Sequence, residues 1–248
     1  MKVIDIFNFL NNLFSVSSAC DFDNVGLLLG DGNQNVEKVL VSLDCSLETV
    51  NYACENKCQL IITHHPVIFS PLKSVLKGSI AFELIRNNIS VICMHTNLDI
   101  AKMGVSDTLA KIIGLEKIMP FEASDGFLIR QGVISPVSPK SFARAIKTNL
   151  NCNVKYFDGG NNINRVLVCS GSGGDYVLDA VENGFDALVT SEIKHHQFLL
   201  AKNHNISVFD CGHYETENII IEPLRKLLCD KFKDLEIITH NVIKIEYL

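Results

Sequence analysis

Residues 38–65 read KVLVSLDCSLETVNYACENKCQLIITHH, and this stretch decides the fold class. Its first run, KVLVSLD, and its last apolar run, QLIIT, are rich in β-branched and aliphatic residues, as buried strands are. Ser46 stands where an N-cap is needed for a helix that buries Leu47, Val50 and Cys54 between the two runs. A strand, a helix and a second strand in this order predict a βαβ unit and a mostly parallel sheet.

The same alternation extends to both sides of this unit. An amphipathic helix opens the chain, because apolar residues recur there at helical spacing, and a polar loop through Ser15–Asp21 follows it. Further along we expect a helix over 79–88, a strand over 90–94 and a helix that Ser106 caps and that ends near Gly114.

A cluster of Gly, Pro and Ser within residues 114–126 separates this series from a second one. The second series comprises strands at 127–134, 153–157, 164–169, 186–190 and 206–210, with helices at 139–149, 175–183 and 194–204. A long helix from about 214, bent or broken at Pro223, and two short strands at 235–238 and 242–246 end the chain.

These elements predict an α/β chain of two linked lobes, with mixed, mostly parallel sheets flanked by helices. Residues 1–125 form the first lobe, which the C-terminal segment, about 215–248, completes, and residues 126–214 form the second. A length of 248 residues, 47% of them hydrophobic, is enough to build a packed core, which excludes disorder as the main state.

The charge and the cysteines narrow the function classes. The balance of 22 basic and 28 acidic residues gives a net charge of −6, so a general basic field for nucleic acid is absent. Nine scattered cysteines, most of them in apolar runs, suit reduced thiols in a cytoplasmic protein. No stretch reaches the ~18 consecutive apolar residues of a membrane span, and the N-terminus lacks the unbroken apolar run of a signal peptide.

Six of the eight histidines follow the predicted strands directly, together with several acidic residues. In strand order they are His64 and His65, then His95 and Asp99, then Glu192, His195 and His196, and finally His213 and Glu217. Ligands of open α/β sheets bind outside the carboxyl ends of the strands, so these side chains are expected to converge although they are far apart in sequence. We expect His204 and His240 to be ordinary surface or packing residues.

The spacing within these groups is typical of metal sites. Pro66 forces a turn after His65, which allows two neighbouring histidines to serve one site. His95 and Asp99 are four residues apart, as are His213 and Glu217, and in a helix that separation places both side chains on one face. Each pair alone is more often a solvated surface pair. Independent surface pairs have no reason to follow buried strands every time, so the set as a whole favours a metal site.

The donor types limit the metal and its chemistry. Imidazole and carboxylate without a thiolate pair suit zinc, manganese or ferrous iron, and Cys54 and Cys58 have the wrong spacing for a zinc knuckle. Two carboxylates and at least three histidines favour two divalent ions over one, because a carboxylate can bridge the two ions. A water that bridges two such ions is a hydroxide nucleophile at neutral pH, so the expected reaction is hydrolysis of a small molecule.

The motifs together resemble the Nif-three-like dinuclear metal-centre family, which is also labelled GTP cyclohydrolase type 2. The segments that carry the resemblance are DFDNVGLLLG (21–30), ITHHPVIF (62–69), HTNLD (95–99), GSGGD (171–175), TSEIKHH (190–196) and GHYETE (212–217). They run from the first helix to the last. The resemblance implies two intertwined α/β lobes that assemble into a toroidal homohexamer, without the third domain that some relatives carry between the halves.

The resemblance also implies roles for individual residues. One metal would be held by His64, Asp99 and Glu217, and the other by His65, His213 and the same Glu217 as a bridge. His95 and His196 match positions that line the cavity, which implies proton transfer or substrate contact. His195 falls where the family often has an aromatic residue. Phe22 takes the place of a Trp that often follows the Asp at position 21, and is expected to preserve packing.

Two loops have a less specific pattern. Gly171–Asp175 follows a strand and precedes a helix, so its backbone could present N–H groups to a phosphate. It lacks the Lys-Ser/Thr of a P-loop, and a plain tight turn explains the sequence equally well. Asp21 and Asn24 can act as an Asx-type turn that orders a loop over the site.

The leading hypothesis is a dinuclear metal-dependent hydrolase that opens the purine ring of a nucleotide and releases formate, as the family label suggests. A metal-dependent phosphoesterase would use the same centre. The rival class is a non-catalytic metal-binding ring that serves in assembly, metal handling or regulation. A ring that encircles DNA is disfavoured by the net charge and would need a local basic lining from Lys111, Lys117, Arg130, Lys140, Arg144 and Lys147.

Overall fold

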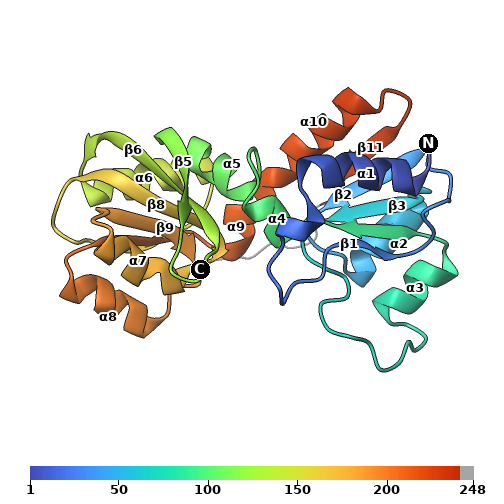
Figure 1. Cartoon of the computed structure of the whole chain (residues 1–248), viewed down its shortest axis with the longest axis horizontal. Helices are drawn as coiled ribbons and strands as arrows, with labels where there is room; N and C mark the ends of the chain where they lie inside the picture. Colours follow the sequence, from blue (N-terminus) through green and yellow to red (C-terminus); the bar gives the residue numbers. More distant parts are fainter. Residues whose placement is uncertain (241–248) are drawn as a thin grey trace. The chain divides into compact units, whose positions relative to one another are not determined.

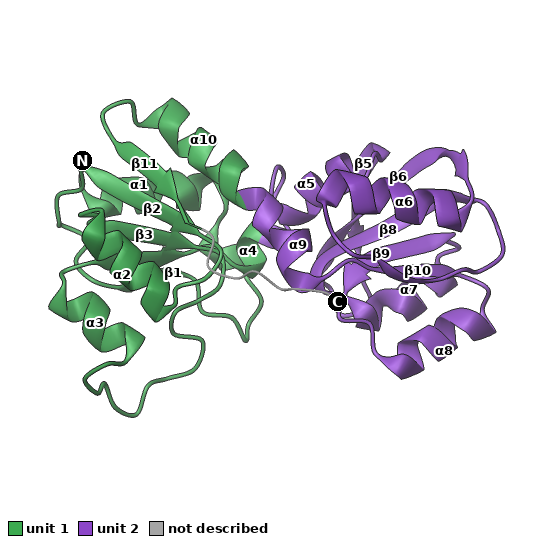
Figure 2. Ribbon diagram, turned by 180° about the vertical axis from the view of Figure 1, so that it is seen from behind, with its two compact units in different colours: residues 1–98, 221–248 green, residues 99–220 purple. Residues whose placement is uncertain are grey.

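The computed structural model describes residues 1–240 and divides the chain into two compact units. Unit 1 contains Met1–Leu98 and the segment from Ile221 onward, and unit 2 contains Asp99–Ile220 (Figure 2). Each unit is built around one sheet with helices on its faces. Within residues 1–240, no helix is both long enough and apolar enough to cross a membrane.

The sheet of unit 1 has five strands in the order β1-β4-β3-β2-β11. The four strands β2, β3, β4 and β11 are parallel, and β1 pairs antiparallel with β4 at one edge. The strand bounds are β1 Gly26–Leu29, β2 Lys38–Ser42, β3 Leu60–Thr63, β4 Ser90–Cys93 and β11 Glu236–Thr239. The helices are α1 Val3–Leu13, α2 Leu47–Glu55, α3 Ile80–Arg86 and α10 Ile221–Lys231, with a 3-10 turn at Val16–Ser18. The short helix α4 Thr96–Asp99 spans the passage from unit 1 to unit 2.

Two pairs of helices cover the sheet of unit 1. Figure 1 shows α1 and α10 on one side of it and α2 and α3 on the other. On the second side, Val50 of α2 and Leu84 of α3 pack against Leu40, Ile61 and Val91 of three adjacent strands. All five are fully buried, as expected for parallel strands that are covered on both faces.

The sheet of unit 2 has six strands in the order β5-β6-β8-β9-β10-β7. Only β8, β9 and β10 are parallel to one another among its described pairs, and the other three pairings are antiparallel. The strand bounds are β5 Glu116–Glu122, β6 Leu128–Val137, β7 Lys155–Phe157, β8 Ile163–Ser172, β9 Ala187–Ser191 and β10 Ser207–Asp210. The helices are α5 Val105–Ile112, α6 Pro139–Leu150, α7 Val177–Glu182, α8 His195–Asn203 and α9 His213–Glu217, with 3-10 turns at Gly174–Tyr176 and Asn218–Ile220.

Strand periodicity divides the core of unit 2 into two layers. Val166 and Val168 of β8 face a cluster that contains Phe142 of α6. Their neighbours Leu167 and Cys169 face the opposite cluster, with residues of α7 and α8. Successive side chains of a strand point to opposite faces, so β8 contributes to both layers.

The predicted α/β fold with mixed, mostly parallel sheets is confirmed, and the bounds of the two units differ from the prediction. Parallel pairing dominates unit 1, whereas unit 2 is mixed. The chain passes into unit 2 at residues 98/99 rather than near 125, and returns at 220/221 rather than 214. The first shift arises because α5 packs on β6 and β8, and because the 114–126 segment forms β5, which pairs with β6. Pro120 is tolerated in β5 because β5 is an edge strand.

Several element bounds also differ. The N-cap of α5 is Gly104, not Ser106, whose hydroxyl instead lies 2.9 Å from that of Ser170. The helix expected from 214 is divided into α9, a 3-10 turn and α10, with Pro223 in the first turn of α10, where a proline is compatible with a helix. The strand expected at 242–246 lies outside the described residues.

Candidate metal centre

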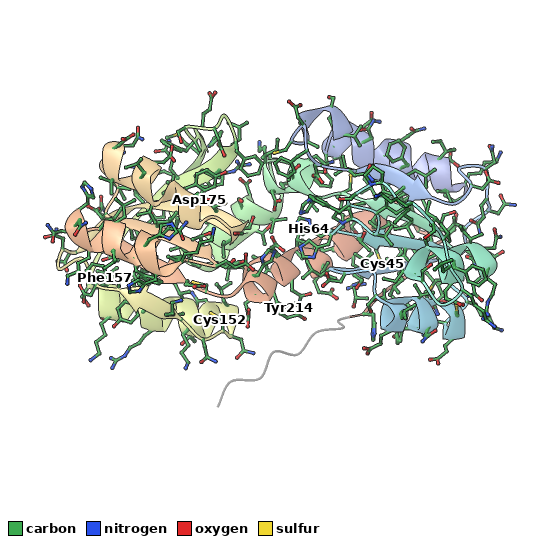
Figure 3. All side chains as sticks on the ribbon, turned by 90° about the horizontal axis from the view of Figure 1, so that it is seen from below. Cys45, His64, Cys152, Phe157, Asp175 and Tyr214 are labelled. Carbon is green, nitrogen blue, oxygen red and sulfur yellow. The ribbon has the colours of Figure 1, made fainter. Side chains whose placement is uncertain are left out.

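Three histidine side chains of unit 1 converge at the carboxyl end of its sheet. His64 and His65 follow β3 directly, and His95 follows β4 after one intervening residue. Thr63 pairs with Cys93 in the parallel register, so the two strands end side by side. One ring nitrogen from each histidine lies within 4.8 Å of the others, and the ring centroids are 5.1–5.6 Å apart. His64 is labelled in Figure 3.

Hydrogen bonds fix the orientation of two of these rings. His64 Nδ1 lies 2.9 Å from the carbonyl oxygen of Met94, and His65 Nδ1 lies 2.8 Å from Asp44 Oδ1. A carbonyl oxygen only accepts, so His64 Nδ1 is the protonated nitrogen that donates, and in the neutral form of the ring Nε2 carries the lone pair. An oxygen acceptor on one ring nitrogen is the usual arrangement of a metal-binding histidine.

His95 is oriented by an ionised carboxylate. Its Nδ1 lies 2.9 Å from Asp23 Oδ1, while Thr96 donates to Asp23 Oδ2 from its backbone N–H at 3.0 Å and from its hydroxyl at 2.5 Å. Burial acts to raise the pKa of Asp23, but the hydrogen bonds from His95 and Thr96 outweigh it and lower the pKa to about 2. Asp23 is therefore an acceptor at neutral pH, so His95 donates through Nδ1, and Nε2 is the ring nitrogen that can accept a proton.

Unit 2 contains a group of potential ligands of its own, Asp99, His213 and Glu217. One carboxylate oxygen of Asp99 lies within 4.8 Å of one of Glu217. Asp99 Oδ1 accepts a 3.0 Å hydrogen bond from the Ser170 hydroxyl of β8. Asp99 is only 7% exposed and Glu217 only 3%, and carboxylates this deeply buried need cationic or hydrogen-bonding partners.

His213 bridges two carboxylates in unit 2. Its Nε2 lies 3.0 Å from Glu217 Oε2, and its Nδ1 lies 3.1 Å from Glu192 Oε1. The hydrogen bond to Glu217 raises the pKa of His213 to about 9 against the opposing effect of burial, with Glu192 adding to the rise. The imidazolium is therefore the stable form here, and a metal ion bound to this nitrogen would replace a proton.

Gly171 makes room for the Glu217 carboxylate. It adopts φ +61°, and a Cβ added to it would lie 2.2 Å from Glu217 Oε1 and 3.4 Å from His213 Nε2. Its backbone N–H donates to Thr216 Oγ1 at 3.1 Å, which ties the end of β8 to α9. For Gly171, these contacts support the tight-turn interpretation of the Gly171–Asp175 loop.

The donors of the two groups fit a divalent transition metal. Imidazole nitrogens with anchored Nδ1 atoms and buried carboxylates are the ligands that Zn²⁺, Mn²⁺ and Fe²⁺ share in proteins. The glycine at position 171 leaves the Glu217 carboxylate a space that any other residue would fill. No described cysteine belongs to a group of three or more convergent potential ligands.

Other predicted residues lie elsewhere. His195 and His196 are exposed on the first turn of α8, and within residues 1–240 neither belongs to a group of three convergent ligands. Phe22, expected to pack, is 68% exposed. Arg130 is 3% exposed and paired with Asp107, so it cannot belong to a basic lining for DNA. Asn24 joins two loops, since its Nδ2 donates to the carbonyl of Ile68 at 2.5 Å.

Asp23 and Asp44 orient two histidines of the cluster and are not among the residues predicted from the sequence. Asp44 ends the KVLVSLD run and so follows a buried strand, which is the same signal that identified the histidines. Asp23 lies in the DFDN segment, whose flanking Asp21 and Asn24 drew attention instead. Both acids act on histidines 21 and 72 residues further along the chain, a pairing that only the fold reveals.

The chain is similar to known proteins over most of its length. The family model described as Duf34/NIF3 (NGG1p interacting factor 3) matches residues 1–246. A Campylobacter jejuni protein named GTP cyclohydrolase 1 type 2 homolog is 36% identical over 236 residues, covering 91% of each chain. A Clostridium acetobutylicum protein of the same name is 31% identical over 229 residues, covering 88% of this chain and 85% of the relative. The crystal structure of a Staphylococcus aureus hypothetical protein matches with a TM-score of 0.89 at 31% identity, covering 100% of this chain and 99% of that one.

Proposed function

Because the chain belongs to the Duf34/NIF3 family, we propose that it is a hydrolase with a dinuclear metal centre that opens the ring of a purine nucleotide. The observation that carries the proposal is the cluster of His64, His65 and His95, which have an oxygen acceptor at each Nδ1. Relatives named GTP cyclohydrolase 1 type 2 homolog support the choice of GTP as the first substrate to test.

We propose that His64, Asp99 and Glu217 hold one ion, and that His65, His213 and Glu217 hold the other. The covalent path of the chain supports this assignment. Within residues 1–240 the chain passes between the units at 98/99 and at 220/221. Asp99 is the first residue after one crossing, and Glu217 lies four residues before the other.

The bound ions would supply Lewis acidity and lower the pKa of a coordinated water. His95 would move the proton, because Asp23 holds its Nδ1–H and leaves Nε2 to accept a proton and return it to a leaving group. Asp44 would hold the His65 ring in place during turnover. His196 remains our proposed substrate contact, and its exposure on α8 is compatible with reaching a ligand.

The test is release of formate from GTP by protein loaded separately with Zn²⁺, Mn²⁺ or Fe²⁺. We expect formate to accumulate with at least one metal, and the His65→Ala variant to be inactive. His204→Ala is the matched control, because His204 is an exposed histidine at the C-cap of α8. Absence of formate above the His65→Ala level with every metal would refute the cyclohydrolase proposal. Inorganic phosphate in place of formate would identify a phosphoesterase.

A non-catalytic metal-binding role is the second candidate, and the burial of the ligands favours it. His64 is 1% exposed, and Asp99 and Glu217 are nearly as inaccessible. Sites closed to solvent are typical of structural metals. In that case removal of metal would lower the melting temperature or dissociate the assembly, while neither formate nor phosphate would be released from nucleotides by the loaded protein.

We further propose that the protein is a cytoplasmic homohexamer, as the family resemblance implies. The cysteines are present as thiols, and five of the nine are buried, which agrees with a reducing compartment. The assembly is tested by sedimentation velocity at several protein concentrations, where a single species of about six times 27.5 kDa is expected. A monomer or dimer at micromolar concentration would contradict the hexamer.

A further inference from the structure

Two phenylalanines of unit 1 lie exposed beside the three-histidine cluster. Phe22 is 68% exposed and Phe69 is 51% exposed. All fourteen phenylalanines of the chain lie within residues 1–240, and the other twelve are buried or half-buried. The two rings contact each other with centroids 6.4 Å apart and planes inclined by 55°. We call this pair the aromatic wall.

The aromatic wall borders His95. The Phe69 ring meets the His95 ring edge to face, with centroids 6.4 Å apart and an interplanar angle of 85°. His95 in turn lies 5.2 Å from His64 and 5.6 Å from His65 between ring centroids. A molecule that rests on the wall is therefore next to the imidazoles.

Hydrogen bonds hold both loops of the wall in place. Phe22 is followed by Asp23, which is bonded to His95 and Thr96, and by Asn24, whose side chain donates to the carbonyl of Ile68. Ile68 directly precedes Phe69, so the hydrogen bond from Asn24 joins the two loops next to the two rings. The rings are thus presented by segments that are already ordered, which lowers the entropic cost of binding a ligand.

We propose that Phe22 and Phe69 form the binding platform for a planar heteroaromatic ring, such as a purine base, of the substrate of this site. The inference deepens the proposed function and rests on it for the identity of the site. Exposed aromatic faces bind bases by stacking, which is effective for any flat π-system and needs no specific hydrogen bonds. The wall therefore supplies what the ligand cluster lacks, a surface that recognises the ring to be opened.

The geometry favours a flat ligand over an aliphatic surface of another protein chain. The two rings are inclined to each other and have an imidazole at their edge, so they form an all-aromatic corner. The exposed aliphatic residues of the same loop, Leu72, Val75 and Leu76, follow further along the chain. Those residues are the better candidates for a subunit contact.

The test is direct binding of guanosine and of ribose to the metal-loaded protein by isothermal titration calorimetry. We expect guanosine to bind and ribose to bind far more weakly. Phe22→Ala and Phe69→Ala should each raise the Kd of guanosine by roughly fivefold or more, while Phe22→Tyr and Phe69→Tyr should restore binding. Ile85→Ala is the control, because Ile85 is 61% exposed on α3 of the same unit and is not part of the wall.

The outcomes separate this inference from the proposed function. If guanosine binding depends on the two rings but no formate is released, the wall stands and the cyclohydrolase reaction does not. If formate is released and both alanine variants keep the native Kd and KM, the wall is refuted. It is equally refuted if guanosine binds no better than ribose, or if the double alanine variant changes the sedimentation coefficient, which would make the rings a subunit contact.

Discussion

Single side chains at the carboxyl ends of β3 and β4 have their chemistry set by one neighbour each. The backbone carbonyl of Met94 orients His64, and the carboxylates of Asp44 and Asp23 orient His65 and His95. These neighbours select which ring nitrogen carries the proton, and that choice decides which nitrogen can bind a metal or accept a proton. Asp44 and Asp23 are therefore positioning residues, and their replacement should act by disturbing the orientation of the histidine rings.

We expect Asp44→Asn to weaken metal binding by about 10- to 100-fold, because His65 would lose the carboxylate that orients it. Metal affinity is measured by competition with a chromophoric chelator. Glu48→Gln is the control, since Glu48 lies 3.7 Å from His240, a carboxylate and imidazole pair of the same unit that belongs to no group of three potential ligands among the described residues. Equal affinities of Asp44→Asn and the native protein would show that the His65 ring needs no such partner.

Gly171→Ala should weaken metal binding as well as lower stability. The added Cβ would lie 2.2 Å from Glu217 Oε1, so the carboxylate must move. Gly160→Ala separates this clash from backbone strain, because Gly160 has φ +86° and a Cβ there would meet nothing within 4 Å. Both variants should lose about 1 kcal/mol from the left-handed backbone. Only Gly171→Ala should also reduce metal content, as measured by elemental analysis.

Asp107→Asn should destabilise unit 2 by about 3–5 kcal/mol at neutral pH, because it leaves the buried Arg130 guanidinium without its counter-charge. The backbone carbonyls of Ile100 and Ala101, at 2.6 and 2.8 Å from Arg130 Nη2, do not replace that charge. Urea denaturation measures the change. Asp230→Asn, at an exposed pair with Lys233, should change the free energy of unfolding by less than about 1 kcal/mol.

The same pair has a pH signature. Burial acts to raise the pKa of Asp107, but the hydrogen bond from Arg130 and further contacts outweigh it, so the folded pKa is lowered. The stabilisation by ionised Asp107 is then complete above its unfolded pKa of about 3.9 and is lost as the pH falls through its folded pKa. The difference in stability between native protein and Asp107→Asn should shrink below about pH 4. A difference that stays constant down to pH 2 would contradict this origin.

Among the elements, α2 shows how a helix start supports the site. Ser46 Oγ accepts from the backbone N–H of Thr49 at 3.1 Å, and the Thr49 hydroxyl donates to the carbonyl of Asp44 at 3.0 Å. The cap therefore also fixes the backbone of the residue that orients His65. The predicted N-cap at Ser46 is confirmed, because the βαβ pattern and the cap chemistry are both local signals.

We expect Ser46→Ala to lower the free energy of unfolding by about 1 kcal/mol, and Ser46→Asp to retain most of the stability. Urea denaturation followed by circular dichroism measures both variants. If the cap also positions Asp44, Ser46→Ala should weaken metal binding by less than Asp44→Asn does, but measurably. Loss of stability with unchanged metal affinity would restrict the cap to the helix.

Strands β1 and β5 could not be predicted from the sequence, because both lie at sheet edges. Both are edge strands that pair antiparallel with one neighbour, so their residues are mostly half-buried or exposed. In addition, β1 has only four residues, and β5 contains charged residues and a proline. The central strands β2, β3 and β4 are covered on both faces and could be predicted from their composition alone. Missing β5 is also what moved the predicted boundary from 98/99 to 125.

For the molecule as a whole, the candidate ligands are spread along the chain. The sequence could predict the residue types of these ligands better than the residues that orient them. Histidines and acids after strands are a visible pattern, whereas Asp23 acts on His95 across 72 residues of chain. The family resemblance implies that His196 lines the cavity, and His196 is exposed on the first turn of α8, so its role stays a prediction. Side-chain pairings of this kind depend on packing rather than on local pattern.

Removal of metal tests the proposal that both units supply ligands to the metal centre. A ligand that binds only the folded form stabilises every segment that supplies its donors. We therefore expect chelation to speed hydrogen exchange at the carboxyl ends of β3 and β4 in unit 1 and in α9 of unit 2. Faster exchange in one unit alone would show that the other supplies no ligand. Amides of α3 and α6, away from the candidate ligands, serve as internal references.

The discontinuous path of unit 1 has a consequence for synthesis. During translation, residues 99–220 leave the ribosome before the segment that forms α10 and β11, so unit 2 is complete while unit 1 still lacks its last strand. Until then β2 is an unpaired edge with the fully or nearly fully buried side chains Val39, Leu40 and Val41. An open apolar edge pairs readily with other chains. Nascent chains arrested just before residue 221 should therefore be the form that depends most on chaperones.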